Sequence, residues 1–259
     1  MKELSLAGNT VWITGASAGI GEACARAFAA VGANVLATAR RTEKVGALAA
    51  ELLKAHGVRA LGAGLDVRDG AAVESFVASL EGPWAEVEVL VNNAGLARGL
   101  EPLHEGSVAD WDEMIDTNVK GLLLVTRAVI PGMLARGRGH VVNIGSVAGH
   151  EVYPGGNVYC ATKHAVAALT RAMQWDYVET PLRFTSVDPG LVETEFSLVR
   201  FHGDARKAKR PYEGIELLTA DDVADAVLWA ATRRANVNVG EIVLTPVHLA
   251  SMTRVARKA

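Results

Sequence analysis

The stretch TVWITGASAGIG, residues 10–21, places an apolar run directly before a glycine-rich turn near the start of the chain. The run lacks a regular polar alternation, which is typical of a strand buried on both faces of a parallel sheet. Gly15, Gly19 and Gly21 permit a tight turn, and the helix that follows offers unpaired N–H groups to a pyrophosphate. The spacing is GxxxGxG rather than GxGxxG, so the turn predicts a dinucleotide site only in combination with other features.

The same order of strand and helix repeats along the chain. Further apolar runs occupy residues 34–39, 58–66, 87–92, 140–145, 184–188 and 241–245, and the run at 58–66 is the weakest. Between them, residues 21–31, 43–56, 71–80, 111–133, 158–178 and 221–232 carry charges three or four apart, as helices do. This alternation predicts an α/β fold: one doubly wound, Rossmann-type domain over residues 1–259, with about seven parallel strands and helices on both faces. Residues 194–214 break the pattern, which is typical of a lid, a binding insertion or local disorder, and we expect a substrate-lid-like insertion there.

Composition excludes several classes of protein. The 259 residues carry 26 basic and 29 acidic side chains, a net charge of −3, so no basic field attracts nucleic acid or an anionic membrane. No run approaches the about 18 apolar residues of a membrane span. Two cysteines, Cys24 and Cys160, cannot build a disulfide scaffold and fit a reducing compartment, so we expect a cytoplasmic protein. The seven histidines lack paired metal-ligand spacing, and no metal site is expected.

The end of the second predicted strand carries two arginines where NAD-binding proteins place an acid. The sequence there reads ATARR, residues 37–41. A carboxylate would bind the ribose 2′-hydroxyl of NAD, whereas guanidinium groups suit the 2′-phosphate of NADP. We therefore expect NADP, with Arg40 as the main contact and Arg41 as its helper. The alternative is that both are solvated arginines at the start of a helix.

A tyrosine and a lysine form the predicted chemical centre. Tyr159 and Lys163 are four residues apart and lie on one face of a helix. A nearby ammonium stabilises phenolate and is expected to lower the phenol pKa from its ordinary value of about 10, giving a general acid/base. Ser146 follows the fifth strand, where its hydroxyl is suited to hold a substrate oxygen, and Asn118 lies in a predicted helix.

The order and spacing of TGASAGIG, NNAG, Asn118, Ser146, YxxxK and DPG with Thr194 resemble the short-chain dehydrogenase/reductase family over residues 11–246. The resemblance implies a Rossmann-type sheet and a catalytic tetrad of Asn118, Ser146, Tyr159 and Lys163. In such a tetrad the tyrosine transfers the proton, the lysine also holds the nicotinamide ribose, the serine orients the substrate oxygen and the asparagine supports a proton-relay water. The residues it implies for the cofactor are Gly15, Ser17, Gly19, Ile20, Gly21, Arg40, Arg41, Asp66, Val67, Asn92, Ala94, Gly95, Tyr159, Lys163, Pro189, Gly190, Val192 and Thr194.

A narrower resemblance is to the NADP-dependent 3-hydroxy acid dehydrogenases. It rests on WDEMIDTN at 111–118, PGM at 131–133, GGNVY at 155–159 and TEFSLVRF at 194–201. It implies a small-molecule substrate such as L-serine or L-allo-threonine, bound by Ser146, Tyr159 and Arg200. Arg200 is suited to hold the substrate carboxylate in a bidentate pair, although it could instead be an exposed or interface arginine. The region after Val247 departs from the group's pattern, which leaves the terminal contacts open.

Two other functions remain open at this point. A reductase of neutral ketones or 3-oxoacyl thioesters would keep the tetrad without depending on Arg200. A redox-sensing regulator would bind NADP(H) without turnover, but such proteins commonly lack the tyrosine or the lysine. The resemblance also implies a homotetramer formed through two long helices, whose apolar faces at 122–125 and 165–169 fit either a core or an interface.

Overall fold

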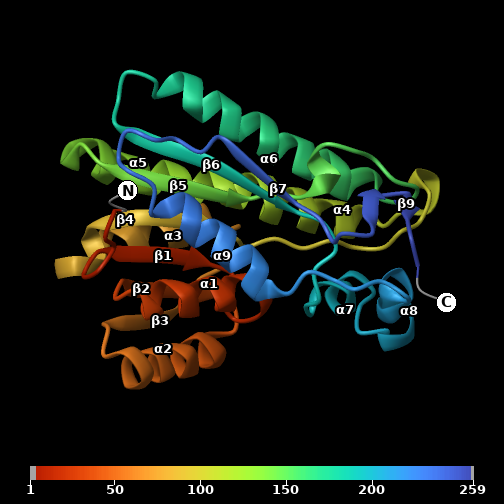
Figure 1. Ribbon diagram of the computed structural model, residues 1–259, viewed down its shortest axis with the longest axis horizontal. Coiled ribbons are helices and arrows are strands. Elements are labelled where there is room, and N and C mark those ends of the chain that lie inside the picture. Colours follow the sequence, from red (N-terminus) through yellow and green to blue (C-terminus); the bar gives the residue numbers. More distant parts are fainter. Residues whose placement is uncertain (1–3, 258–259) are drawn as a thin grey trace.

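The computed structural model describes residues 4–257 and has a seven-stranded parallel sheet at its centre (Figure 1). The strand order is β3-β2-β1-β4-β5-β6-β7, and every neighbouring pair is parallel. The strands are β1 (Thr10–Thr14), β2 (Asn34–Ala39), β3 (Ala60–Gly64), β4 (Val87–Asn92), β5 (Gly139–Ile144), β6 (Leu182–Pro189) and β7 (Glu241–Leu244). The predicted doubly wound α/β fold with seven parallel strands is confirmed.

Helices cover both faces of the sheet. On one face lie α1 (Gly19–Ala30), α2 (Thr42–His56) and α9 (Ala220–Ala231), which share an apolar core with the sheet. On the other face lie α3 (Gly70–Ala78), α5 (Leu122–Arg136) and α6 (Asn157–Asp176). Because both faces are covered, every residue of the inner strands β1, β2 and β5 is buried, which explains why their mainly apolar sequences lack polar alternation.

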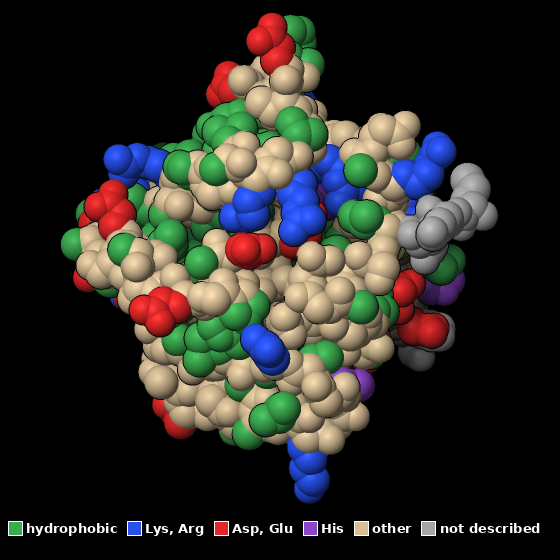
Figure 2. Space-filling view, turned by 90° about the vertical axis from the view of Figure 1, so that its left-hand side faces the viewer, with side chains coloured by type: hydrophobic (Ala, Val, Ile, Leu, Met, Phe, Trp, Pro, Cys, Tyr) green, Lys and Arg blue, Asp and Glu red, His purple; other side chains and the backbone are tan. Residues whose placement is uncertain are grey.

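The strand order reverses between β1 and β4. Strands β2 and β3 extend to one side of β1, whereas β4 to β7 extend to the other. The connections after β1 and β4 therefore leave in opposite directions and open a crevice at the carboxyl ends of the strands. Figure 2 views the molecule from the left-hand side of Figure 1, where basic, acidic and apolar side chains are interspersed.

The predicted helix at 111–133 is interrupted. The structure has α4 (Val108–Ile115), one wider π-helical turn at Asp116–Gly121, and then α5. By length and composition, the combined stretch Val108–Arg136 could cross a membrane. Here it packs on β4 and β5 and buries Leu122, Val125 and Met133, which is the position of a core helix.

The predicted insertion at 194–214 contains more regular structure than its sequence indicates. It forms α7 (Phe196–Arg200), α8 (Ala205–Lys209) and a 3-10 turn at Arg210–Tyr212, all next to the carboxyl edge of the sheet. After β7, a short antiparallel pair, β8 (Leu249–Ser251) and β9 (Arg254–Val255), lies at the same edge. Met252 lies in the turn between these two strands, and its backbone N–H donates to Glu151 at 3.0 Å.

Candidate active site

A cavity of about 710 Å³ opens at the carboxyl edge of the sheet. It is lined from β1 across to the 194–214 insertion, so segments distant in sequence meet around one space. Most residues predicted as site residues line it: Gly15, Ser17, Gly19, Ile20, Arg40, Arg41, Asp66, Val67, Ala94, Gly95, Ser146, Tyr159, Lys163, Pro189, Gly190, Val192, Thr194 and Arg200. Three predicted residues do not line it: Gly21, Asn92 and Asn118.

The glycine turn after β1 is tied to the end of β4. Gly15 has a φ of +67°, and a Cβ there would lie 2.8 Å from the Cα of Ala94. Asn93 Nδ2 donates to the carbonyls of Thr14 and Gly15 at 2.9 and 3.1 Å. Ala18, which precedes α1, provides no side-chain cap. The first N–H groups of α1 therefore stay available to a phosphate, and the missing Cβ of Gly15 keeps the approach open.

Two residues predicted to contact the cofactor, Asn92 and Gly21, do not line the cavity. Asn92 is 5% exposed and donates to Thr126 Oγ1 at 2.8 Å and to Asn143 Oδ1 at 2.9 Å. Its neighbour Asn93 lines the cavity instead. A Cβ on Gly21 would overlap the Asn93 amide, so packing against Asn93 requires a glycine at this position.

Asn118 also lies behind the wall, within the π-helical turn. Its Oδ1 accepts from the N–H of Leu96 at 2.8 Å, and its Nδ2 donates to the Leu96 carbonyl at 2.8 Å and to Thr162 Oγ1 at 3.1 Å. The side chain therefore holds the segment after β4 against α6. Only the backbone of Asn118 is left to take part in a proton relay.

Basic groups gather where a 2′-phosphate is expected. Arg41 Nε donates to Ser17 Oγ at 3.0 Å, and Arg41 also pairs with Glu195 at 2.9 Å. Hydrogen bonding from Arg41 holds the pKa of Glu195 below its usual value. Arg40 is half-exposed and makes a longer contact of 3.3 Å with Glu113. Arg41 is thus held in place by side chains around it, whereas Arg40 is freer to reach a ligand.

Asp66 follows β3 on the same side of the cavity. Arg68 donates to its carboxylate, with the shortest contact at 2.6 Å. This hydrogen bonding holds the pKa of Asp66 below its usual value. Asp66 therefore stays ionised, and with Val67 it forms the wall at which the family resemblance implies an adenine.

Three members of the predicted tetrad meet at the inner end of the cavity. Tyr159 and Lys163 project from α6, and Lys163 Nζ lies 5.9 Å from the centroid of the Tyr159 ring. Lys163 Nζ donates to the carbonyl of Ile144, the last residue of β5, at 2.8 Å. Ser146 follows two residues later, and its hydroxyl accepts from the N–H of Ala148 at 3.1 Å.

The pKa of Tyr159 differs in direction from the sequence prediction. Burial raises it above its ordinary value, and this outweighs the opposing effects of Arg200 and of the hydrogen bond with Ser146. Burial also lowers the pKa of Lys163 to about 8, against the opposing charge of Asp188. The spacing of Tyr159 and Lys163 indicates the neighbouring ammonium but not desolvation, which is the larger effect in this site.

Arg200 lies over Tyr159 and is buried rather than exposed. The side chain is 9% exposed, and its guanidinium carbon lies 5.0 Å from the Tyr159 ring centroid and 5.2 Å from that of Phe196. One terminal nitrogen donates to Tyr153 Oη at 2.8 Å. The buried Nε has no hydrogen-bond partner. A buried cation with an unsatisfied donor in a cavity wall is suited to an anionic ligand.

The insertion that carries Arg200 is tied to the segment after β4. The N–H of Gly99 donates to the Arg200 carbonyl at 3.0 Å, and Arg98 donates to the Val199 carbonyl. Sequence reasoning did not single out Tyr153 or Arg98, although both line the cavity. Tyr153 begins the stretch YPGGNVY, but a tyrosine two residues before a glycine pair gives no signal of a contact with position 200.

Comparison with known proteins identifies the family. The model of the short chain dehydrogenase family matches residues 9–203. Over 238 residues the chain is 52% identical to the NADP-dependent 3-hydroxy acid dehydrogenase of Salmonella typhi, covering 92% of this chain and 94% of that protein. Over 254 residues it is 43% identical to the NADP-dependent 3-hydroxy acid dehydrogenase of Schizosaccharomyces pombe, covering 98% of each. The closed form of a serine dehydrogenase complexed with NADP+ superposes with a TM-score of 0.90 at 46% identity, covering 96% of this chain and 100% of that one. The chain therefore belongs to the short-chain dehydrogenase family.

Proposed function

We propose that this protein is an NADP-dependent dehydrogenase of short 3-hydroxy acids, such as L-serine or L-allo-threonine, and reduces the corresponding 3-oxo acids in reverse. The observation that carries the proposal is Arg200. Its buried guanidinium has an unsatisfied Nε and lies beside the Tyr159 ring, so a carboxylate bound there would bring a hydroxyl two carbons away close to the phenol. The names of similar proteins, 3-hydroxy acid and serine dehydrogenases, point to the same substrate class.

The cofactor end of the cavity fits NADP. Gly15 leaves room for a pyrophosphate at the start of α1, and no acid stands where an NAD site would place one. Arg40, Arg41 and Ser17 are the residues that would hold the 2′-phosphate. Bound NADP+ would supply the hydride acceptor for oxidation, and NADPH the donor for reduction.

The tetrad would carry out the proton transfer. In reduction, Tyr159 donates its phenolic proton to the carbonyl oxygen, and its raised pKa keeps that proton in place at neutral pH. In oxidation the phenol must lose a proton, and the charges of Lys163 and Arg200 stabilise the phenolate. Ser146 orients the substrate oxygen. Asn118 would support relay water through its backbone.

The test is a comparison of initial rates at 340 nm with NADP+ and with NAD+. The substrates are L-serine, L-allo-threonine, 3-hydroxypropionate and a neutral secondary alcohol. Turnover of the acids with NADP+ and little turnover of the alcohol is the expected result. Turnover of the alcohol alone would retain the tetrad and contradict the carboxylate site. No turnover with any substrate would contradict the proposed activity.

We also propose that the chain is one domain, assembles as a homotetramer and acts in the cytoplasm. One continuous sheet supports the domain assignment. Exposed apolar residues on the two long helices, including Leu123 on α5 and the 81% exposed Trp175 on α6, support the assembly. Cys24 and Cys160 are free thiols, which fits a reducing compartment. Light scattering coupled to size exclusion tests the tetramer, and cell fractionation tests the location.

A further inference from the structure

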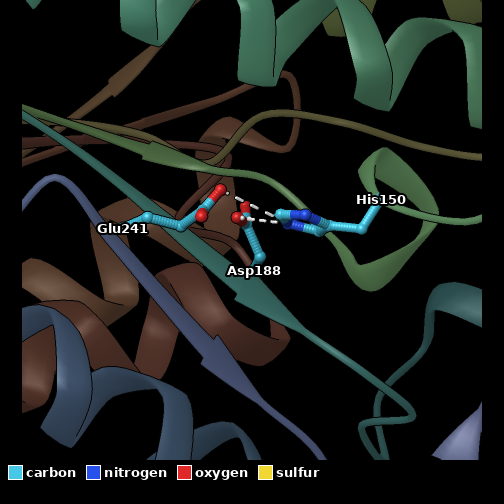
Figure 3. Close-up of side chains that lie close together, drawn as sticks. All are labelled: His150, Asp188 and Glu241. Atoms are coloured by element: carbon cyan, nitrogen blue, oxygen red, sulfur yellow. Dashed lines mark hydrogen bonds and ion pairs between the residues drawn. The ribbon is translucent and has the colours of Figure 1, made fainter.

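A buried carboxylate stands behind the active-site cavity without contacting it. Asp188, near the end of β6, is 1% exposed. Ser186 Oγ donates to its Oδ1 at 2.6 Å, and His150 Nε2 lies 2.9 Å from its Oδ2. Figure 3 shows His150 and Glu241 pointing toward Asp188 from opposite sides, one from the segment after β5 and the other from β7.

Asp188 contacts both ends of the segment that carries Ser146. At one end, a Cβ on Gly145 would overlap Asp188 Oδ1, so the carboxylate packs directly on the Gly145 backbone. At the other end, His150 binds the same carboxylate. Gly145 is further fixed by its N–H, which donates to the Val187 carbonyl at 2.8 Å. The Asp188 carboxylate therefore holds the segment from 145 to 150 at both of its ends.

The same carboxylate is the negative charge that acts on Lys163. The Lys163 ammonium donates to the Ile144 carbonyl, on the residue directly before Gly145. Within residues 4–257, no carboxylate approaches Lys163 Nζ within ion-pair distance, and Asp188 acts across the intervening peptide. Burial brings the pKa of Lys163 down to about 8, and the Asp188 charge opposes that effect. Without it, a larger fraction of Lys163 would be neutral near physiological pH.

The other groups around Asp188, which are Glu241, His150 and Arg171, contact one another. Glu241 Oε1 lies 3.5 Å from His150 Nε2 and 3.7 Å from Arg171 on α6. His150, Asp188 and Glu241 each place one potential metal-ligand atom within 4.8 Å of the others. However, Ser186, His150 and Arg171 already partner the two carboxylates. The cluster is therefore better described as an ion-pair network than as an open set of metal ligands.

We propose that Asp188 is a positioning residue of the reaction: its carboxylate holds the Ser146 segment in place and keeps Lys163 in its ammonium form. The proposal rests on the proposed function only in that Ser146 and Lys163 serve the proton transfer. Asp188 does not line the active-site cavity. Asp188 acts on the reaction through its packing contact with Gly145 and through the effect of its negative charge on Lys163.

The test replaces Asp188 by asparagine, which keeps the shape and removes the charge. The amide introduced by this substitution can still accept from Ser186 and face His150. Asp188→Asn is expected to lower kcat at least tenfold. The alkaline decline of kcat should move to lower pH by about one unit, because an opposite charge nearby typically shifts a pKa by at least that much. The KM values for NADP+ and the acid should change less than twofold.

Two further variants separate the parts of the proposal. Glu241→Gln is the matched control, because Glu241 belongs to the same cluster but its carboxylate does not pack on Gly145. The kcat and the pH profile of this variant should equal those of the wild type. His150→Phe keeps a ring but removes the nitrogen that contacts Asp188, so it should lower kcat several-fold at every pH without moving the alkaline decline. An unmoved alkaline decline in Asp188→Asn overturns the electrostatic role. Normal kcat in His150→Phe overturns the positioning role, even if Asp188→Asn does not fold.

A second measurement does not depend on turnover. The 13Cε signal of Lys163, assigned by its loss in Lys163→Arg, reports the ammonium titration directly. It should titrate at lower pH in Asp188→Asn than in the wild type and Glu241→Gln. Equal midpoints in all three proteins would refute the proposal, whereas failure of the proposed function would appear only in the substrate panel.

Discussion

Replacing Arg200 by methionine should separate acids from neutral alcohols. Methionine keeps an unbranched chain among Tyr153, Tyr159 and Phe196 while removing the guanidinium. Nη2 donates one of its two protons to Tyr153, which leaves its other N–H and the unsatisfied Nε–H for a substrate carboxylate. Two hydrogen bonds to a charged group contribute about 1.5–3 kcal/mol each, or roughly 3–6 kcal/mol in sum. At about 1.4 kcal/mol per tenfold, kcat/KM for the acids should fall by roughly 10²–10⁴.

The assay compares kcat/KM for L-serine and a neutral secondary alcohol in wild type and Arg200→Met. The alcohol has no carboxylate to lose, so its kcat/KM should change less than about tenfold, through packing alone. Tyr153→Phe is the matched control because it removes one acceptor from Arg200 and leaves the cation in place, so its loss on the acids should be much smaller. Equal losses on acid and alcohol in Arg200→Met would refute the carboxylate site and leave Arg200 as a packing residue.

Four other changes test the site and the fold. Tyr159→Phe removes the transferable proton and should lower kcat by at least the ~10²–10⁴ typical of general acid/base loss, with NADP+ binding by fluorescence unchanged; near-normal kcat would contradict the assignment. Arg40→Asp should weaken NADP+ binding by about 2–3 kcal/mol and leave NAD+ binding unchanged, since a charge-assisted bond becomes a repulsion; an unchanged NADP+/NAD+ preference means that the phosphate is held elsewhere. Gly145→Ala pushes a methyl group into the Asp188 carboxylate and should lower the Tm and kcat together, and full activity would show that the contact yields freely. Burial holds the pKa of His140 well below 6.5 in the folded protein, so below pH 6.5 this histidine is protonated in the unfolded chain but not in the folded one. The wild type should therefore lose stability as the pH falls from 7 to 5, and the Tm of His140→Gln should depend less on pH.

The sheet was predictable because each strand is specified locally. β1, β2 and β5 are buried along their whole length, and burial on both faces favours a mainly apolar run without polar alternation, which the sequence shows directly. β3 is only partly buried, and its sequence signal was the weakest. Most of the predicted site residues line one cavity, because the carboxyl ends of parallel strands meet at the same edge of the sheet.

The parts that the sequence did not reveal depend on contacts between distant segments. Whether Asn92 or Asn93 faces the cavity depends on the pairing of β4 with β5, where Asn92 meets Asn143. The contact of Tyr153 with Arg200 joins two segments 47 residues apart. The pKa of Tyr159 depends on how deeply the ring is buried, and the spacing between Tyr159 and Lys163 does not reveal that burial.

The π-helical turn at Asp116–Gly121 changes the direction in which the side chains of the helix point before and after it. One extra residue in a helical turn rotates everything after it by about 100°. The half before the turn sends Met114 toward the apolar cluster around Tyr159, whereas the half after it sends Val125 into the core against the sheet. Deleting one residue there would restore a regular helix, but its two halves could then no longer satisfy both neighbours. The turn therefore lets the first half of one continuous helix pack against the apolar cluster around Tyr159 while its second half packs against the sheet.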